Sequence, residues 1–172
     1  ATKSIFLVTN GQEPDMIQKL GDENALPTQL YLSTNAADYK SFLKINRPRY
    51  DDSWERWNRT LKMLSTLGTR TVLRITLIRG YNDDEEMIPA FASLLRQSNT
   101  HFVEIKSYMH IGRSTNRLEH SDMLEMSEVR SFANKLAQEN SDFTVMDESG
   151  ISRIVILQNK KRFVDRFIPA CC

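Results

Sequence analysis

Short apolar runs and helix-like stretches alternate along almost the entire chain, and this alternation constrains the fold more than any single motif. The first run, Ile5–Val8, ends in the turn signal Thr9-Asn10-Gly11, and Pro14 then opens a helical stretch that Gly21 stops. Further strand-like runs are expected at residues 30–32, 71–78, 102–105, 143–146 and 151–157. Strands and helices in this order, with short connections, predict parallel βαβ units.

The strand-like runs are apolar on nearly every residue, as expected when helices cover one face of a sheet and a barrel or second layer covers the other. We therefore predict an α/β fold with an open parallel sheet, helices on its outer face, and a single domain over residues 1–172. The chain begins almost directly on a buried-type strand, which would be an exposed hydrophobic edge. We expect a piece of a larger protein, or a strand that finds its partner in another chain.

Two helix starts can be placed from capping residues. Asp52 stands where an N-cap belongs, with Glu55 three residues on as in a capping box. Asn82 is expected to head the next helix, because the acidic residues 83–86 that follow suit the positive end of a helix dipole.

Charge and cysteine content narrow the class of protein. Lysine and arginine total 23 and aspartate and glutamate 22, so any affinity for nucleic acid would come from local clusters. No apolar run reaches bilayer length and no signal peptide is evident, which predicts a soluble, cytoplasmic chain. The adjacent Cys171 and Cys172 are the only cysteines, so they are expected to be reduced surface thiols and to form no metal site.

In βα architectures, functional groups gather where strands end and lead into the following helices. These positions carry hydroxyls and amides suited to a ribose or an amino-acid carboxylate. They are Thr9, Asn10, Ser33, Asn35, Arg79, Asn82, Lys106, Tyr108, Asp147 and Glu148. A structural role is the alternative for most of them: a turn at Asn10, helix caps at Ser33, Asn35 and Asn82, and a hairpin turn at Asp147 and Glu148.

Lys106 is the strongest catalytic candidate, because it lies on an otherwise buried strand, in the sequence Val-Glu-Ile-Lys. Glu104 shares its face of the strand, so Lys106 either forms an ion pair there or faces a substrate. The same strand runs into a basic loop that contains Arg113 and Arg117. The three histidines lack metal-ligand spacing, so we predict no metal site.

Several stretches, in this order, resemble one family. They are Phe6–Gln12, Gln29–Ser33, Asn46–Pro48 ahead of Trp54–Arg56, Arg74–Asn82, residues 102–118, and Asp147–Ser149 ahead of Ser152-Arg153. Over residues 5–160 the chain resembles the carboxyl-terminal half of the radical SAM tRNA-wybutosine enzymes, the 4-demethylwyosine synthases, in their archaeal form.

The resemblance implies a partial (β/α)₆ barrel. It also implies a reaction that condenses a two-carbon unit of pyruvate with N1-methylguanosine in phenylalanine tRNA. The family cleaves S-adenosylmethionine at a four-iron four-sulfur cluster. Its C-x-x-x-C-x-x-C cluster motif and the lysine proposed to hold pyruvate lie upstream of the matched region. We therefore expect no cluster ligands in this chain and no radical formation by it alone.

Site roles follow from the resemblance residue by residue. Thr9 and Asn10 would lie near the amino-acid or ribose end of S-adenosylmethionine, Ser33 and Asn35 at its ribose, and Arg79 and Asn82 near its carboxylate or adenine. Lys106 would face the substrate. The residues expected at tRNA phosphates are Arg47, Arg49, Arg113 and Arg117.

Two other functions stay open at this point. One is a free-standing barrel lyase that forms a Schiff base between Lys106 and a keto acid. The other is a non-enzymatic tRNA-binding module that uses the two arginine-bearing loops, with Arg47 and Arg49 around Pro48 also compatible with a solvated loop.

Overall fold

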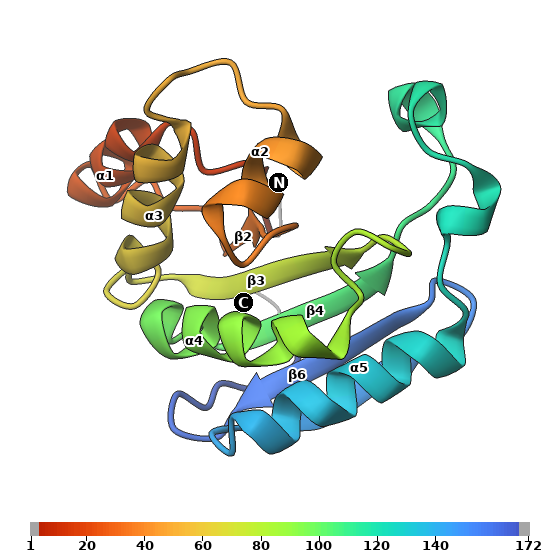
Figure 1. The fold of residues 1–172 in the computed structure, drawn as a ribbon. Coiled ribbons are helices and arrows are strands. Elements are labelled where there is room, and N and C mark those ends of the chain that lie inside the picture. Colours follow the sequence, from red (N-terminus) through yellow and green to blue (C-terminus); the bar gives the residue numbers. More distant parts are fainter. Residues whose placement is uncertain (1–3, 169–172) are drawn as a thin grey trace.

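A six-stranded sheet with helices packed on it makes up residues 4–168, the part of the chain that the computed structural model describes (Figure 1). Cys171 and Cys172 lie outside the described residues. The strands are β1 (Phe6–Thr9), β2 (Gln29–Ser33), β3 (Arg70–Leu77), β4 (Phe102–Ser107), β5 (Phe143–Ser149) and β6 (Ile154–Asn159). The α-helices are α1 (Pro14–Asp22), α2 (Tyr39–Asn46), α3 (Ser53–Met63), α4 (Ile88–Ser98) and α5 (Met126–Glu139).

The sheet has the order β1-β2-β3-β4-β6-β5, and its first four strands are parallel. The prediction of parallel strands throughout is wrong for the last two, because β6 is antiparallel to both β4 and β5. Only residues 150–153 separate β5 from β6, and a parallel connection needs a crossover of about a dozen residues or more. The hairpin alternative is therefore the correct one, although Asp147 and Glu148 lie within β5 and not in its turn.

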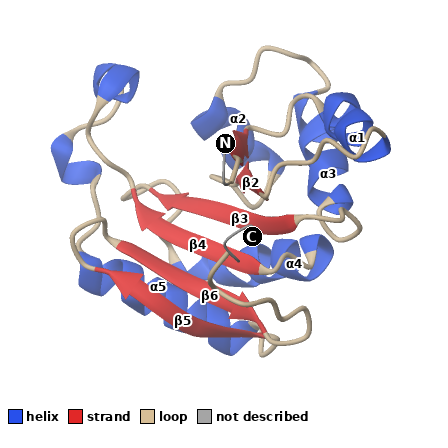
Figure 2. Ribbon diagram, turned by 180° about the vertical axis from the view of Figure 1, so that it is seen from behind, coloured by secondary structure: helices blue, strands red, loops and turns tan. Residues whose placement is uncertain are grey.

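Helices cover one face of the sheet, as seen where α4 and α5 lie behind β3, β4 and β6 (Figure 2). The other face, here called the open face, carries no helix within residues 4–168 and is crossed in part by the segment after β6. On β3, Leu73, Ile75 and Leu77 are fully buried and point into this helix-covered core. Trp57 and Phe42 from α3 and α2 fill the core beside β2. The predicted α/β architecture, with helices on the outer face of a partial barrel, is confirmed.

The open face carries polar side chains between apolar ones. Arg74 of β3 pairs with Glu104 of β4 at 2.7 Å, and its guanidinium lies 4.4 Å from the centre of the Tyr31 ring. At the edge of the sheet, Phe6 and Val8 of β1 are 54% and 49% exposed. This face therefore presents charged and apolar groups that no helix in residues 4–168 covers.

Asp52 is the N-cap residue of α3, as predicted, whereas the prediction for Asn82 is wrong. The Asp52 side chain makes no cap hydrogen bond and binds the Arg56 guanidinium at 2.8 Å. Asn82 does not head a helix. It precedes a 3₁₀ turn (η1, Glu85–Met87) that Asp84 caps, and α4 begins only at Ile88.

An arm projects from the sheet between β4 and α5, and contains the 3₁₀ turns η2 (Gly112–Asn116) and η3 (His120–Asp122) (Figure 1). We call it the basic arm after Arg113 and Arg117 in its outer part; the part next to α5 carries the acidic residues Glu119, Asp122 and Glu125. Its tip is exposed, with Ile111 65% accessible. No helix within residues 4–168 has the length and apolar character needed to cross a membrane.

Candidate functional site

The carboxyl edge of the sheet holds a cavity of about 570 Å³ between the β1–α1 loop, the end of β2 and the segment after α2. It brings together six of the predicted site residues: Asn10, Ser33, Asn35, Arg47, Arg49 and Arg117. The sequence rule that polar groups gather at the carboxyl ends of strands thus locates a real cavity. Its volume lies within the 300–1,000 Å³ typical of small-molecule sites.

Helix α3 fixes the two strand ends that line this cavity. Thr60 donates its hydroxyl to the carbonyl of Gly11 at 2.9 Å, and the Trp57 indole N–H donates to the carbonyl of Ser33 at 3.1 Å. Gly11 has φ of +77°, and a Cβ there would meet Leu32 at 2.8 Å and Trp57 at 3.0 Å. Only glycine lets the β1–α1 loop turn this closely over the core.

Asn82 supports the β2 side of the cavity from behind. It is fully buried; its Oδ1 accepts from the Ile78 backbone N–H at 2.6 Å, and its Nδ2 donates to the carbonyls of Asn35 and Thr76, both at 2.8 Å. The amide therefore ties the loop after β2 to the end of β3. Because its polar atoms are engaged in this way, Asn82 holds the site in shape and does not line it.

Two buried acceptors in the cavity wall have no donor within residues 4–168. They are Gln12 Oε1 and Asn35 Oδ1. The amide nitrogens of both side chains are engaged, that of Gln12 with the Ser53 carbonyl at 3.1 Å and that of Asn35 with Asn46 Oδ1 at 3.3 Å. An unsatisfied buried acceptor costs about 1–3 kcal/mol, so a ligand that brings donors would be stabilised here.

Gln12 is a site residue that the sequence analysis did not single out. It stands one position beyond the turn signal Thr9-Asn10-Gly11, which is the only local cue to it. Its orientation depends on Ser53, 41 residues further along the chain.

The arginines around the cavity form no ion pair in the described part of the chain, and Glu13, the acidic residue that also lines it, contacts Tyr50 and Arg56 instead. Within residues 4–168, none of Arg47, Arg49 and Arg117 pairs with a carboxylate, whereas Arg56 and Arg59 on neighbouring α3 both do. Arg117 makes one long contact, 3.5 Å to the Ile45 carbonyl. These guanidinium groups are therefore available to an anionic ligand.

Arg79 lies away from the cavity, and its donors are engaged elsewhere. It forms a two-pronged ion pair with Glu128 of α5, with N–O distances of 2.6 and 2.7 Å, and donates to the carbonyls of Ser121 and Met123 at 3.0 Å. The hydrogen bond to Glu128 raises the pKa of Arg79 and lowers that of Glu128. This cluster fastens the base of the basic arm to α5.

Lys106 lies on the open face of β4, opposite Thr76 of β3 and Ile154 of β6. The alternative of an ion pair between Lys106 and Glu104 is not what the structure shows, because Glu104 pairs with Arg74. Lys106 Nζ makes no hydrogen bond or ion pair with any residue in the range 4–168. It is half-buried and does not line the 570 Å³ cavity.

The two remaining predicted residues also lie outside the cavity wall. Thr9 accepts a hydrogen bond from the Gly11 backbone N–H at 3.0 Å and so stabilises the turn. Arg113 stands exposed on η2 of the basic arm.

No group of three or more histidine, cysteine, aspartate or glutamate side chains in the described part of the chain is arranged to hold a metal ion. The residues present there do not fit an iron–sulfur cluster, which takes cysteine thiolates as ligands.

Two family models match the chain, and together they cover most of it. The radical SAM superfamily model matches residues 1–92, and the model described as wyosine base formation matches residues 97–159. The boundary between the two matches, residues 93–96, falls within α4.

Two relatives carry the same name. The S-adenosyl-L-methionine-dependent tRNA 4-demethylwyosine synthase of Methanocaldococcus jannaschii is 41% identical over 93% of this chain and 48% of its own length. That of Pyrococcus abyssi is 38% identical over 88% of this chain and 44% of its own length. The chain thus spans about half the length of these relatives.

Solved structures agree with the sequence matches. A structure of TYW1 with a lysine–pyruvate adduct bound has a TM-score of 0.78 and 40% identity, over 91% of this chain and 47% of that one. A crystal structure of archaeal TYW1 has a TM-score of 0.73 and 36% identity, over 92% of this chain and 47% of that one. The resemblance inferred from sequence is confirmed: the chain belongs to the radical SAM superfamily and, within it, to the tRNA 4-demethylwyosine synthase family.

Proposed function

We propose that residues 1–172 form a single domain, the carboxyl-terminal half of a catalytic barrel that makes 4-demethylwyosine from pyruvate and N1-methylguanosine in phenylalanine tRNA. Family membership supports the reaction class, and the cavity at the carboxyl edge supplies a place for it. A cytoplasmic location would follow from such a tRNA substrate.

The observation that carries this proposal is the pair of buried acceptors, Gln12 Oε1 and Asn35 Oδ1, in one cavity. S-adenosylmethionine brings an ammonium group, two ribose hydroxyls and an adenine amino group, all of which donate hydrogen bonds. Asn10 and Ser33 add further polar groups to the same wall. When bound, this cofactor would supply the radical chemistry of the family, and these residues would bind and orient it.

The supporting residues hold the cofactor wall in place. Thr9 fixes the turn that presents Asn10, and Asn82 fixes the backbone of Asn35. Arg79, predicted near the cofactor carboxylate, would act through the basic arm that it anchors. Because the described residues offer no ligands for an iron–sulfur cluster, we assign none to them and derive no step through it.

The tRNA would meet the positive rim of the cavity. Arg47, Arg49 and Arg117 line it without a carboxylate partner, and Arg113 extends the same charge along the arm. Forked guanidinium donors suit phosphate oxygens, and such contacts position a nucleic acid without reading its sequence.

Lys106 would face the substrate from the open side of the sheet, since its ammonium group has no partner in residues 4–168. This observation also keeps a second candidate function open, a Schiff base between Lys106 and a keto acid. Borohydride reduction in the presence of pyruvate tests it: an adduct that is lost in Lys106→Ala supports the lyase, and the absence of any adduct excludes it.

Calorimetric titration of S-adenosylmethionine tests the cofactor site, with the amino-terminal half of the Methanocaldococcus jannaschii relative added in trans. We expect binding that Gln12→Ala weakens about tenfold, while Gln18→Ala, at the surface of α1, leaves it unchanged. If no binding is seen at high protein concentration with the amino-terminal half present, the assignment of this chain as half of a cofactor site is wrong. Mass spectrometry of nucleosides from treated tRNA then tests the reaction itself.

A further inference from the structure

A second, smaller cavity of about 200 Å³ adjoins the first one at the carboxyl edge. It lies between α2, the end of β3 and the basic arm. Four residues line both cavities: Asn35, Ile45, Arg47 and Arg117. The two spaces are therefore neighbours that a single ligand can occupy together.

Three cationic side chains line the smaller cavity, and none of its lining residues is acidic. Lys44 and Arg47 come from the end of α2, and Arg117 comes from the arm opposite. The Lys44 ammonium lies 4.4 Å from the centre of the Tyr81 ring, which holds it at the cavity wall. No carboxylate within residues 4–168 pairs with any of the three, so their combined charge favours an anion.

Two of the neutral hydroxyl groups that line the smaller cavity are already engaged. Tyr108 donates its hydroxyl to Ser114 Oγ at 3.0 Å, and Ser114 donates in turn to the Ile111 carbonyl at 2.6 Å. These bonds shape the wall and hold the arm against the end of β4. The three cations are left to recognise a ligand, together with the hydroxyls of Thr76 and Tyr81, which make no hydrogen bond within residues 4–168.

Size restricts what the smaller cavity can take. Its 200 Å³ is below the 300–1,000 Å³ typical of sites that hold a drug-sized ligand. One small anionic group fits it better than a whole cofactor does. Arg47, shared by both cavities, places such a group next to whatever the larger cavity holds.

We propose that the smaller cavity binds one phosphodiester group of single-stranded RNA, next to the nucleotide that meets the arginine rim of the larger, cofactor-binding cavity. The proposal rests on the proposed tRNA function and adds Lys44 and Tyr81 to the site. Phosphate contacts of this kind set the register of a strand, so the cavity would determine which nucleotide reaches the larger space.

Fluorescence anisotropy with a labelled five-nucleotide RNA tests the cavity. Lys44→Gln should weaken binding five- to tenfold and reduce the slope of log affinity against log salt by about 0.7, the value for one contact to a single strand. Lys40→Gln is the matched control: it lies on the same helix, is exposed, and lines neither cavity. It should change affinity less than twofold.

Neutral linkages sharpen this test. A methylphosphonate at one position of the RNA should weaken binding to the unmodified chain more than binding to Lys44→Gln, because the variant has already lost one of the three cationic contacts to that linkage. Equal losses in Lys44→Gln and Lys40→Gln, or the same methylphosphonate effect in both proteins, would overturn the cavity assignment and leave the proposed tRNA function intact.

Failure of RNA binding altogether would instead contradict the tRNA function. The cavity is then tested with inorganic phosphate, followed by the NMR signals of Lys44 and Tyr81. A saturable shift that Lys44→Gln abolishes supports an anion site, and no shift refutes it.

Discussion

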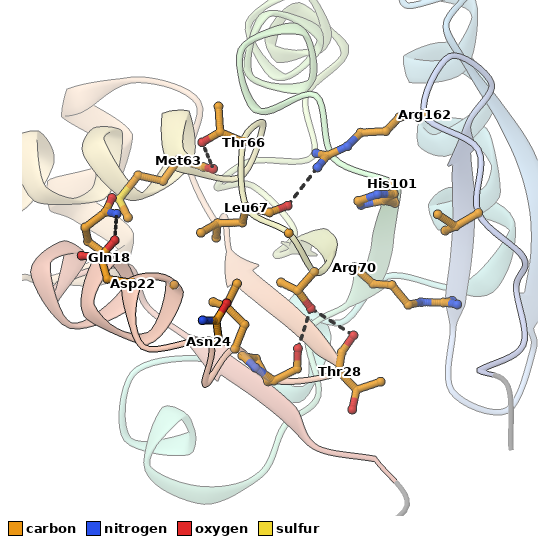
Figure 3. A pocket seen from close by; sticks show the side chains of 16 residues that line it. Gln18, Asp22, Asn24, Thr28, Met63, Thr66, Leu67, Arg70, His101 and Arg162 are labelled. Atoms are coloured by element: carbon orange, nitrogen blue, oxygen red, sulfur yellow. Dashed lines mark hydrogen bonds between the residues drawn. The ribbon is translucent and has the colours of Figure 1, made fainter. Parts of the chain in front are cut away.

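Arginine side chains have opposite roles at the two ends of the parallel strands, the amino edge and the carboxyl edge of the sheet. At the amino edge, a cavity of about 890 Å³ is lined by Arg70, Arg162 and His101 (Figure 3). Arg70 donates to three successive backbone carbonyls in residues 165–167, and Arg162 donates to those of Leu64, Leu67 and Asn99. At the carboxyl edge, Arg47, Arg49 and Arg117 make almost no such bonds.

This difference shows that a cavity lined with arginine is not by itself an anion site. The amino-edge guanidinium groups close the structure by holding the segment after β6 against the sheet, and burial lowers the pKa of both. The carboxyl-edge groups keep their donors for a ligand. Free hydrogen-bond donors, more than cavity volume, therefore distinguish the functional carboxyl edge from the structural amino edge.

The largest expected effect concerns His101 at the amino edge, whose pKa is lowered to about 4 by burial and by the nearby Arg162 and Arg70. Its usual pKa is about 6.5, so the unfolded chain binds the proton more readily than the folded one. Stability is full above pH 6.5 and is lost as the pH falls toward 4, by about 3 kcal/mol. Urea unfolding between pH 7 and pH 4 measures this loss.

A His101→Gln variant provides the control for this titration. It removes the titrating group, so its stability should fall less steeply over the same range. Parallel curves for the two proteins would show that His101 does not carry the effect, because carboxylate titration is common to both.

The next effect tests whether the carboxyl edge also contains a structural side chain. Asn82→Ala should lower the free energy of unfolding by about 2–3 kcal/mol, because it leaves a buried N–H and two buried carbonyls without partners. Asn10→Ala, exposed on the cavity rim, should cost less than about 0.5 kcal/mol. If the two variants unfold at the same urea concentration, Asn82 is not the support that its geometry indicates.

Arg162→Gln should follow, with a loss of about 2 kcal/mol, since its charge-assisted bonds to carbonyls are partly exposed. Its affinity for RNA should stay unchanged. Arg96→Gln on α4 is the control, as an exposed arginine without an ion pair in residues 4–168. Weaker RNA binding by Arg162→Gln alone would break the distinction between the two edges.

The sequence predicted the strands, the helix-covered face and six residues of the cavity, because periodicity and strand ends are local patterns. It misplaced features that depend on distant partners. Asn82 has the appearance of a helix cap, and only the position of the Asn35 carbonyl, 47 residues earlier, shows it to be a tie between loops. Arg79 likewise reads as a cofactor contact until Glu128, 49 residues later, is seen to hold it.

The prediction that β6 is parallel to its neighbours was also wrong. The parallel expectation came from the regular alternation before it, whereas the four residues between β5 and β6 dictate a hairpin. The predicted runs, 143–146 and 151–157, already leave only four residues between them, so loop length alone could have predicted the hairpin.

The smallest expected effect comes from comparing Arg113, on the arm outside the cavities, with Arg117, which lines them. Arg113→Gln, on exposed η2, should weaken RNA binding about two- to threefold, and Arg117→Gln about tenfold, because Arg117 lines both cavities at the carboxyl edge. Each substitution should reduce the salt dependence of binding by about one phosphate contact or less. Anisotropy titrations at two salt concentrations measure both quantities. An Arg113→Gln loss as large as that of Arg117→Gln would mean that RNA binds along the arm, with the free donors of the cavity as only one part of a longer surface.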